Sequence, residues 1–207
     1  MTKYATQVKE EIKRTIDWMG KQELSDQQID EVVEAILTTQ DEKQQNIKKI
    51  FVTGLGRSGS DAKGFAMRLA HLGFNARCLD EATVPPVEKG DLFILISGSG
   101  ASLTKQIMTA LDINAKVIVI TSLADSVGAR LADIKFVIPG REKEEEEKAA
   151  SLSYEERQMR GLPAFPLGTG FENFAMIALD AIISHLMIIK KKTKEDLERT
   201  HSNIPAM

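Results

Sequence analysis

The sequence has little cysteine, few aromatic residues and no strong bias of charge. Cys78 is the single cysteine among 207 residues, which excludes an internal disulfide and a cysteine-based metal cluster. Aromatic residues make up 5% of the chain, and the formal net charge is −3 at pH 7. Because the basic residues are spread out rather than gathered in a stripe, we expect no nucleic-acid-binding surface.

The sequence also lacks a long uninterrupted apolar run. Its N-terminal residues are charged and contain no apolar segment of the kind found in signal peptides. The longest apolar stretch, residues 174–189, is interrupted by Asp180, Ser184 and His185, so it predicts a buried helix rather than a membrane span. With a single cysteine, which suits a reducing compartment, these features predict a cytoplasmic protein with no membrane partner.

Short apolar runs alternate with helical patterns from about residue 49 onward, and this alternation predicts the fold class. Runs that are apolar throughout are typical of strands buried on both faces, as in a parallel sheet covered by helices. We expect such strands at residues 50–53, 76–79, 92–97, 117–121 and 136–138. The sequence therefore predicts an α/β fold with a doubly wound, five-stranded parallel sheet flanked by helices.

Amphipathic patterns in residues 4–19 and 29–37 predict two helices before the first strand. These N-terminal helices have no sheet of their own, so we expect them to pack on the domain or on another subunit. We interpret the chain, 1–207, as a single domain. Its parts are N-terminal helices (1–47), an αβ core (48–140), a charged, solvated insertion (141–162), and a C-terminal helix and tail (163–207).

A glycine-rich loop follows the first predicted strand. Residues 54–59, GLGRSG, have the form G-x-G-x-x-G. Asp80 and Glu81 follow at about the distance at which a dinucleotide-binding domain places its ribose-binding acid. From this loop alone, both a dinucleotide site and a tight strand–helix turn that needs glycine for its backbone remain open.

A second loop, residues 97–102 with the sequence SGSGAS, follows the third predicted strand and precedes a helix. The glycines let the backbone approach a ligand, and the helix N-terminus supplies N–H groups and a favourable dipole for an anion. Ser97, Ser99 and Ser102 add hydroxyl donors, and three serines exceed what helix capping requires. A second phosphate-binding loop favours a phosphorylated sugar over a dinucleotide as the ligand.

The strings GLGRSG, FAMRLAHLGF, SGSGAS, PLGTGFE and THSN, taken together, resemble the sugar isomerase (SIS) family and, within it, the 6-phospho-3-hexuloisomerase branch. The resemblance covers nearly the whole chain after residue 49. It implies a cofactor-independent isomerase that interconverts D-arabino-3-hexulose 6-phosphate and fructose 6-phosphate, usually as a homotetramer, with a homodimer as the alternative. No His, Asp and Glu residues have metal-ligand spacing, so we expect no metal site.

The resemblance also implies roles for individual residues. By match of motif, the phosphate would contact Ser58 in the first loop and Ser97, Ser99 and Ser102 in the second. Glu172, in PLGTGFE, matches the base that moves a proton between adjacent carbons through a cis-enediol. Taken alone, a glutamate at the start of a helix is also a common first-turn residue.

Two histidines are further candidates, His71 as a catalytic residue beside Glu172 and His201 as a substrate-binding residue. His71 is the leading candidate for a proton donor because its ordinary pKa allows exchange near neutrality, although a histidine at a helix end can also be a cap. His201 lies in the C-terminal THSN string and could reach a neighbour's site.

Further candidates for substrate binding lie in and near the two loops. Arg57 could contact the phosphate or the sugar hydroxyls, or form only a surface ion pair, and Glu81 could bind sugar hydroxyls. The loop glycines that could approach the substrate through their backbone are Gly56, Gly98 and Gly100.

Two other functions stay open at the level of sequence. A non-catalytic SIS-type sensor would bind a phosphosugar and regulate a partner, although the chain before residue 49 is short for a typical DNA-binding domain. A nucleotide-binding protein would use the first loop alone.

Overall fold

The computed structural model describes residues 3–40, 47–140 and 169–201, together with 153, 156, 159–160 and 162–163. Most of the charged insertion predicted at 141–162 lies outside these residues, as do 164–168 and the tail after residue 201. In chain order the elements are α1 (Lys3–Met19), α2 (Asp26–Leu37), the 3-10 helix η1 (Thr38–Gln40), β1 (Lys49–Gly54), α3 (Arg57–His71), β2 (Asn75–Cys78), β3 (Leu92–Ile96), α4 (Thr104–Asp112), β4 (Lys116–Thr121), α5 (Val127–Leu131), β5 (Ile134–Val137), α8 (Thr169–Ile189) and α9 (Lys194–Thr200).

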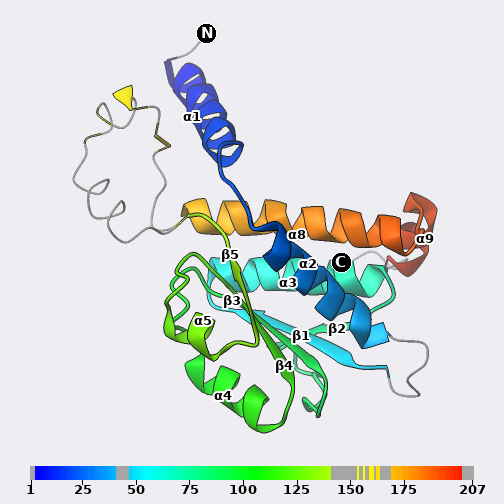
Figure 1. The fold of residues 1–207 in the computed structure, drawn as a ribbon. Coiled ribbons are helices and arrows are strands. Elements are labelled where there is room, and N and C mark those ends of the chain that lie inside the picture. The colour runs from blue at the N-terminus through cyan, green and yellow to red at the C-terminus, as the bar shows by residue number, and fades with distance from the viewer. Residues whose placement is uncertain are drawn as a thin grey trace.

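The strands form one parallel sheet in the order β2-β1-β3-β4-β5, which confirms the predicted doubly wound α/β fold (Figure 1). Every residue of β3 is buried, as the continuous apolar run in its sequence predicts for a central strand. The register pairs Gly54 at the end of β1 with Ile96 at the end of β3. The loops that follow these two strands therefore start side by side.

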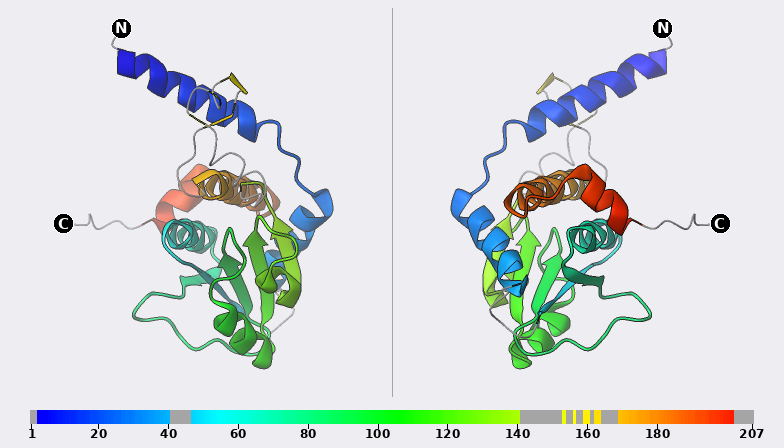
Figure 2. Two further views of the ribbon diagram at one scale, coloured as in Figure 1. Left: turned by 90° about the vertical axis from the view of Figure 1, so that its left-hand side faces the viewer. Right: turned by 90° about the vertical axis from the view of Figure 1, so that its right-hand side faces the viewer.

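Helices cover both faces of the sheet (Figure 2). Helices α2, α3 and α8 lie on one face, and α4 and α5 lie on the other. Successive residues of β1 point alternately to the two faces, so Ile50 and Val52 join the first cluster and Phe51 joins the second.

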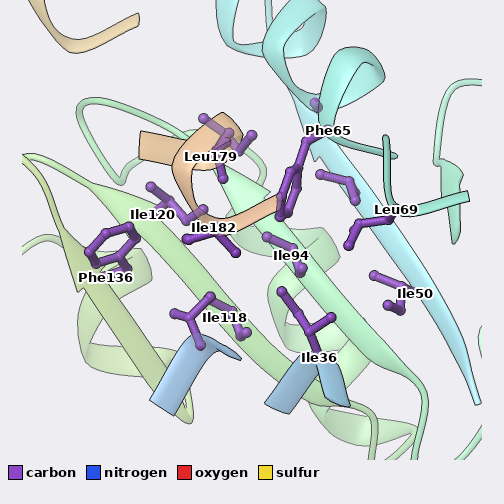
Figure 3. Close-up of a cluster of buried hydrophobic side chains, with 14 of the residues drawn as sticks. Ile36, Ile50, Phe65, Leu69, Ile94, Ile118, Ile120, Phe136, Leu179 and Ile182 are labelled. Atoms are coloured by element: carbon purple, nitrogen blue, oxygen red, sulfur yellow. The ribbon is translucent and has the colours of Figure 1, made fainter. Parts of the chain in front are cut away.

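The larger core cluster lies between the sheet and helices α2, α3 and α8 (Figure 3). Phe65 of α3 is 3% exposed and packs in this cluster with Ile94 of β3 and Leu179 of α8. Truncation of a buried phenylalanine to alanine typically costs about 3–5 kcal/mol of unfolding free energy. Packing in this cluster therefore fixes where the first turns of α3 and α8 lie relative to the sheet.

Helix α8 is long and apolar enough to cross a membrane by length and composition alone. Its inner face is buried against the rest of the domain, with Phe171, Ala175 and Leu186 fully covered, as expected of a core helix. Its outer face exposes Met176 and Ile177.

The two N-terminal helices differ in how they pack. Helix α2 packs against β5, whereas α1 extends away from the sheet and its covering helices (Figures 1 and 2). At the end of α1, the Trp18 ring meets the Phe174 ring edge-on, with centroids 6.3 Å apart. The apolar stripe that predicted α1 is exposed at Tyr4, Val8, Ile12 and Ile16.

Candidate functional site

The candidate site lies where the chain reverses its winding direction. The crossover from β1 passes through α3 on one face of the sheet, and the crossover from β3 passes through α4 on the other. The loops at the carboxyl ends of β1 and β3 therefore lead to opposite faces of the sheet, and open α/β sheets bind their ligands at this point, in the crevice between two such loops. The N-termini of α3 and α4 follow directly after these loops.

The first loop, residues 54–59, turns tightly because of its glycines. A Cβ atom on Gly54 would lie 2.7 Å from the carbonyl carbon of Ser58 and 2.9 Å from the carbonyl oxygen of Ile96. Gly56 has φ +59°, a left-handed conformation that favours glycine. The loop therefore brings Ser58, which is 6% exposed, into the first turn of α3 and close to the end of β3.

The second loop, residues 97–103, folds back on itself. The hydroxyls of Ser97 and Ser102 lie 2.7 Å apart and share a hydrogen bond. Gly100 has φ +58°, and a Cβ atom there would lie 2.0 Å from the hydroxyl oxygen of Ser126. Leu103 is left-handed as well, with φ +56°. A left-handed leucine is uncommon and marks a loop whose shape is set by its surroundings.

The end of β4 anchors this second loop. The carbonyl oxygen of Gly98 accepts hydrogen bonds from the hydroxyls of Thr121, at 3.1 Å, and Ser122, at 2.9 Å. Within the described part of the chain, the N–H groups of Gly98 and Ser99 donate to no protein acceptor. Because the carbonyl is anchored and the N–H groups are available, this loop can donate hydrogen bonds to an anion.

The start of α3 offers the same kind of donor. The first N–H groups of a helix have no intrahelical partner. In the ranges that the structure describes, those of Arg57 and Ser58 find no other acceptor. Together with the second loop, they form a set of backbone and hydroxyl donors at the N-termini of two helices, an arrangement that favours an anion.

Glu172 lies in the first turn of α8 and points toward the start of α3. Its Oε2 atom is 3.6 Å from Nε of Arg57, and its side chain is 14% exposed. The guanidinium of Arg57 also donates to Oδ1 of Asn173 at 3.1 Å. Close packing of Gly140 against the backbone of Phe171 positions this end of α8. Of the roles considered for Arg57, the structure shows an ion pair with the candidate base.

Asp61 belongs to this group although the sequence reasoning did not identify it. Burial and the nearby charge of Glu172 raise its pKa to about 6, while Arg57 opposes the shift. A signal was available, because Asp61 follows Ser58 by three residues on a helix face that continues with the buried Phe65. A carboxylate at the edge of an apolar helical stripe marks a charge placed against the core.

The two candidate histidines lie together, but at the opposite end of α3 from Glu172. Their ring centroids are 5.3 Å apart, and the Thr200 hydroxyl donates to the carbonyl oxygen of His71 at 2.9 Å. Burial, followed by the charges of His201 and Arg68, lowers the pKa of His71. A helix rises 1.5 Å per residue, so His71 is about 20 Å from the first turn of α3. Within one chain, the structure does not bring His71 or His201 to the crevice.

Glu81, the remaining candidate from the sequence, lies beside the edge strand β2. The carboxylate of Glu81 accepts a hydrogen bond from the N–H of Cys78 at 3.2 Å, and its residue is exposed. Burial raises the pKa of the Cys78 thiol to about 11, consistent with its place in the core. Among the described residues, no three His, Cys, Asp or Glu side chains are grouped so that they could hold a metal ion.

Comparisons with known proteins show the family to which the chain is similar. The SIS domain family matches residues 45–159. An Aeropyrum pernix protein is 43% identical over 163 residues, 76% of this chain and 74% of that protein. The 3-hexulose-6-phosphate isomerase of Bacillus subtilis is 33% identical over 87% of this chain and 89% of its own length.

A solved structure from Methanococcus jannaschii, for which a function of 3-hexulose-6-phosphate isomerase has been inferred, superposes with a TM-score of 0.68. It is 30% identical, and the match covers 86% of each chain.

Proposed function

This chain belongs to the SIS domain family, and from that membership we propose that it is a sugar-phosphate isomerase. One observation carries the proposal: the two adjacent loops place hydroxyl and N–H donors at two helix N-termini, and Glu172 lies beside the same turn of α3. Phosphate binding and proton transfer are the two tasks of such an enzyme, and each has its own group of residues here.

The phosphate binds in the crevice between the two loops. Ser58, Ser97, Ser99 and Ser102 donate hydroxyl hydrogen bonds to its oxygens, as the resemblance to the family implies. The N–H groups of Gly98 and Ser99 and the dipoles of α3 and α4 add to the attraction. This arrangement needs no lysine cluster, which agrees with the acidic net charge of the chain.

Glu172 acts as the base. Its carboxylate removes a proton from the carbon next to the carbonyl, and the electron pair of the broken C–H bond forms a C=C bond. The carbonyl oxygen takes the C=O electron pair and a proton to give a cis-enediol. The same carboxylate then returns its proton to the former carbonyl carbon while the other enediol hydroxyl loses its proton and becomes the new carbonyl, so the carbonyl moves by one position and no cofactor is consumed. Arg57 holds the carboxylate near the start of α3, at 3.6 Å.

The names of the relatives favour one substrate. The Bacillus subtilis protein is a 3-hexulose-6-phosphate isomerase, and the Methanococcus jannaschii structure carries the same inferred function. We therefore propose that the enzyme interconverts D-arabino-3-hexulose 6-phosphate and fructose 6-phosphate as a cytoplasmic, single-domain protein. This reaction would place it after a condensation that builds the hexulose from formaldehyde, in the ribulose monophosphate pathway.

A homotetramer, or a homodimer, explains two features of a single chain. The exposed stripe of α1, formed by Tyr4, Val8, Ile12 and Ile16, is covered if a second copy packs on it. A neighbouring copy can also bring its His71 to the crevice as a proton donor, since His71 is too far along its own α3. Replacement of Ile12 by Asp should lower the assembly state in light scattering, and an unchanged mass would count against this interface.

The test of function is turnover of 3-hexulose 6-phosphate by the wild-type protein and by Glu172→Gln. Loss of the base should lower kcat by at least about 100-fold, with KM nearly unchanged. Asp80→Asn serves as the matched control, because Asp80 is an exposed carboxylate whose ion pair is with Lys63, at 2.7 Å, and not with Arg57 or Glu172. Tight binding of the sugar phosphate without turnover by the wild type would instead support a non-catalytic SIS-type sensor.

A further inference from the structure

Asp61 is a partly buried carboxylate to which the proposed mechanism gives no role. It lies one turn into α3 and one turn before Phe65, which packs in the same cluster as Leu179 of α8 (Figure 3). In the described part of the chain its Oδ2 atom is inaccessible to solvent and has no hydrogen-bond partner. A buried acceptor without a donor is costly, so its presence in a folded protein needs an explanation.

Among the described residues, the charges that act on Asp61 come from two groups on two elements. Glu172 reaches it from α8, and Arg57 reaches it from the preceding turn of α3. The other described charges on or near α3 are occupied elsewhere: Lys63 pairs with Asp80 of the segment after β2, and Arg68 lies near the His71 end of the helix.

In the ranges that the structure describes, the remaining elements packed on α3 bring no further charge to Asp61. Strands β1 and β3 present apolar residues to the helix, and Arg77 of β2 faces solvent. Helix α9 contacts α3 near His71, about 15 Å along the helix from Asp61, so its charges lie at the far end.

We propose that Asp61 is a positioning residue whose negative charge raises the proton affinity of Glu172 during turnover. The inference rests on the proposed function, in which Glu172 takes a proton from carbon. The raised pKa of Asp61, about 6, supports the placement, because burial and, after it, the charge of a second carboxylate both favour the protonated form.

Asp61 takes part in the proton transfer only indirectly. When Glu172 accepts the proton from carbon, its charge is neutralised and its repulsion with ionised Asp61 disappears. Asp61 itself exchanges no proton with the substrate. A neutral residue at position 61 removes this repulsion, so Glu172 would be a weaker base and would stay ionised to lower pH.

The first experiment needs no substrate. Carboxyl-carbon NMR follows the titration of Asp61 in the wild type, in Glu172→Gln and in the control Asp80→Asn. We expect an apparent pKa near 6 in the wild type and in Asp80→Asn, and a clearly lower one in Glu172→Gln. An Asp61 titration that does not respond to Glu172→Gln overturns the inference, whatever the protein's activity.

The second experiment compares the pH dependence of kcat/KM in the wild type, Asp61→Asn and Asp80→Asn. Asp61→Asn should move the acidic limb to lower pH by roughly one unit and lower the plateau roughly three- to tenfold, with KM unchanged. Asp80→Asn should match the wild type. Superimposable profiles for the wild type and Asp61→Asn overturn the inference.

A third variant, Asp61→Glu, separates a charge effect from damage to the fold. This variant restores the negative charge, so the acidic limb of its kcat/KM profile should return most of the way to the wild-type position. If the variant folds cooperatively and its acidic limb stays where it is in Asp61→Asn, the proposed role of Asp61 is contradicted. If the wild-type protein has no isomerase activity, the proposed function is wrong. The response of the Asp61 titration to Glu172→Gln would still show whether the two carboxylates interact.

Discussion

Two glycines in or beside α3 provide a direct test of how the crevice is built. Gly54 ends β1, and a methyl group there would lie 2.7 Å from both the carbonyl carbon and the carbonyl oxygen of Ser58 and 2.9 Å from the carbonyl oxygen of Ile96. All three are backbone atoms, so no side-chain rotation can relieve the contact. Gly64 lies in the same α3, and a methyl group there would meet nothing within 4 Å.

The two substitutions to alanine should therefore have opposite effects. Gly54→Ala forces the two loops apart, and overpacking of this kind costs about 1–3 kcal/mol of unfolding free energy. Gly64→Ala should stabilise the protein by about 0.5–1 kcal/mol, because alanine is the better helix former. Urea unfolding followed by circular dichroism measures both values.

Ligand binding gives the second readout of the same pair. Gly54→Ala should weaken binding of the sugar phosphate in calorimetry, since Ser58 and the end of β3 no longer hold their spacing. Gly64→Ala should bind like the wild type. A Gly54→Ala protein with wild-type stability and affinity would refute the close contact of the two loops.

Three further outcomes follow from the contacts of single residues. Ser97→Ala should weaken sugar-phosphate binding about 10- to 100-fold, because a hydrogen bond to a charged group is worth about 1.5–3 kcal/mol; wild-type affinity in calorimetry would count against a phosphate contact. The Cys78 thiol, with a pKa raised to about 11, should react with a disulfide reagent at pH 8 far more slowly in native than in urea-unfolded protein, and equal rates would contradict its burial. Asp61 has a folded-state pKa above its ordinary 3.8, so the folded state binds the extra proton and wild-type stability should fall as pH rises from about 4 to 6. Asp61→Asn should therefore have a higher urea midpoint than the wild type at pH 7 but not at pH 4. A difference in midpoint that stays the same at both pH values would refute the raised pKa of Asp61.

The sheet could be predicted from the sequence because its strands are buried on both faces. The strand predicted at residues 92–97 is an apolar run that leads into SGSG at residues 97–100, and the structure places a fully buried strand at Leu92–Ile96. The glycine positions of both loops could be predicted for a different reason, because a tight turn leaves a local signal in the sequence. The strand order, with β1 next to β3, places the two loops together, and it confirms the doubly wound topology.

The contacts between distant residues could not be predicted, because they depend on how α8 packs across α3. The pairing of Arg57 with Glu172, 115 positions later in the chain, leaves no periodic pattern. The same holds for His71 and His201, which meet only because α9 packs against the end of α3. The role proposed for Asp61 also depends on how α8 packs across α3, although the position of Asp61 on the face of α3 could be predicted from the sequence.

The most direct test of the central claim is isotope exchange with fructose 6-phosphate in heavy water. If Glu172 moves a proton through a 2,3-enediol, NMR should show deuterium at carbon 3 with the wild-type protein and none with Glu172→Gln. Deuterium at carbon 1 would indicate a different isomerisation. Binding of the sugar phosphate with no exchange at any carbon, or unchanged exchange by Glu172→Gln, would contradict the account.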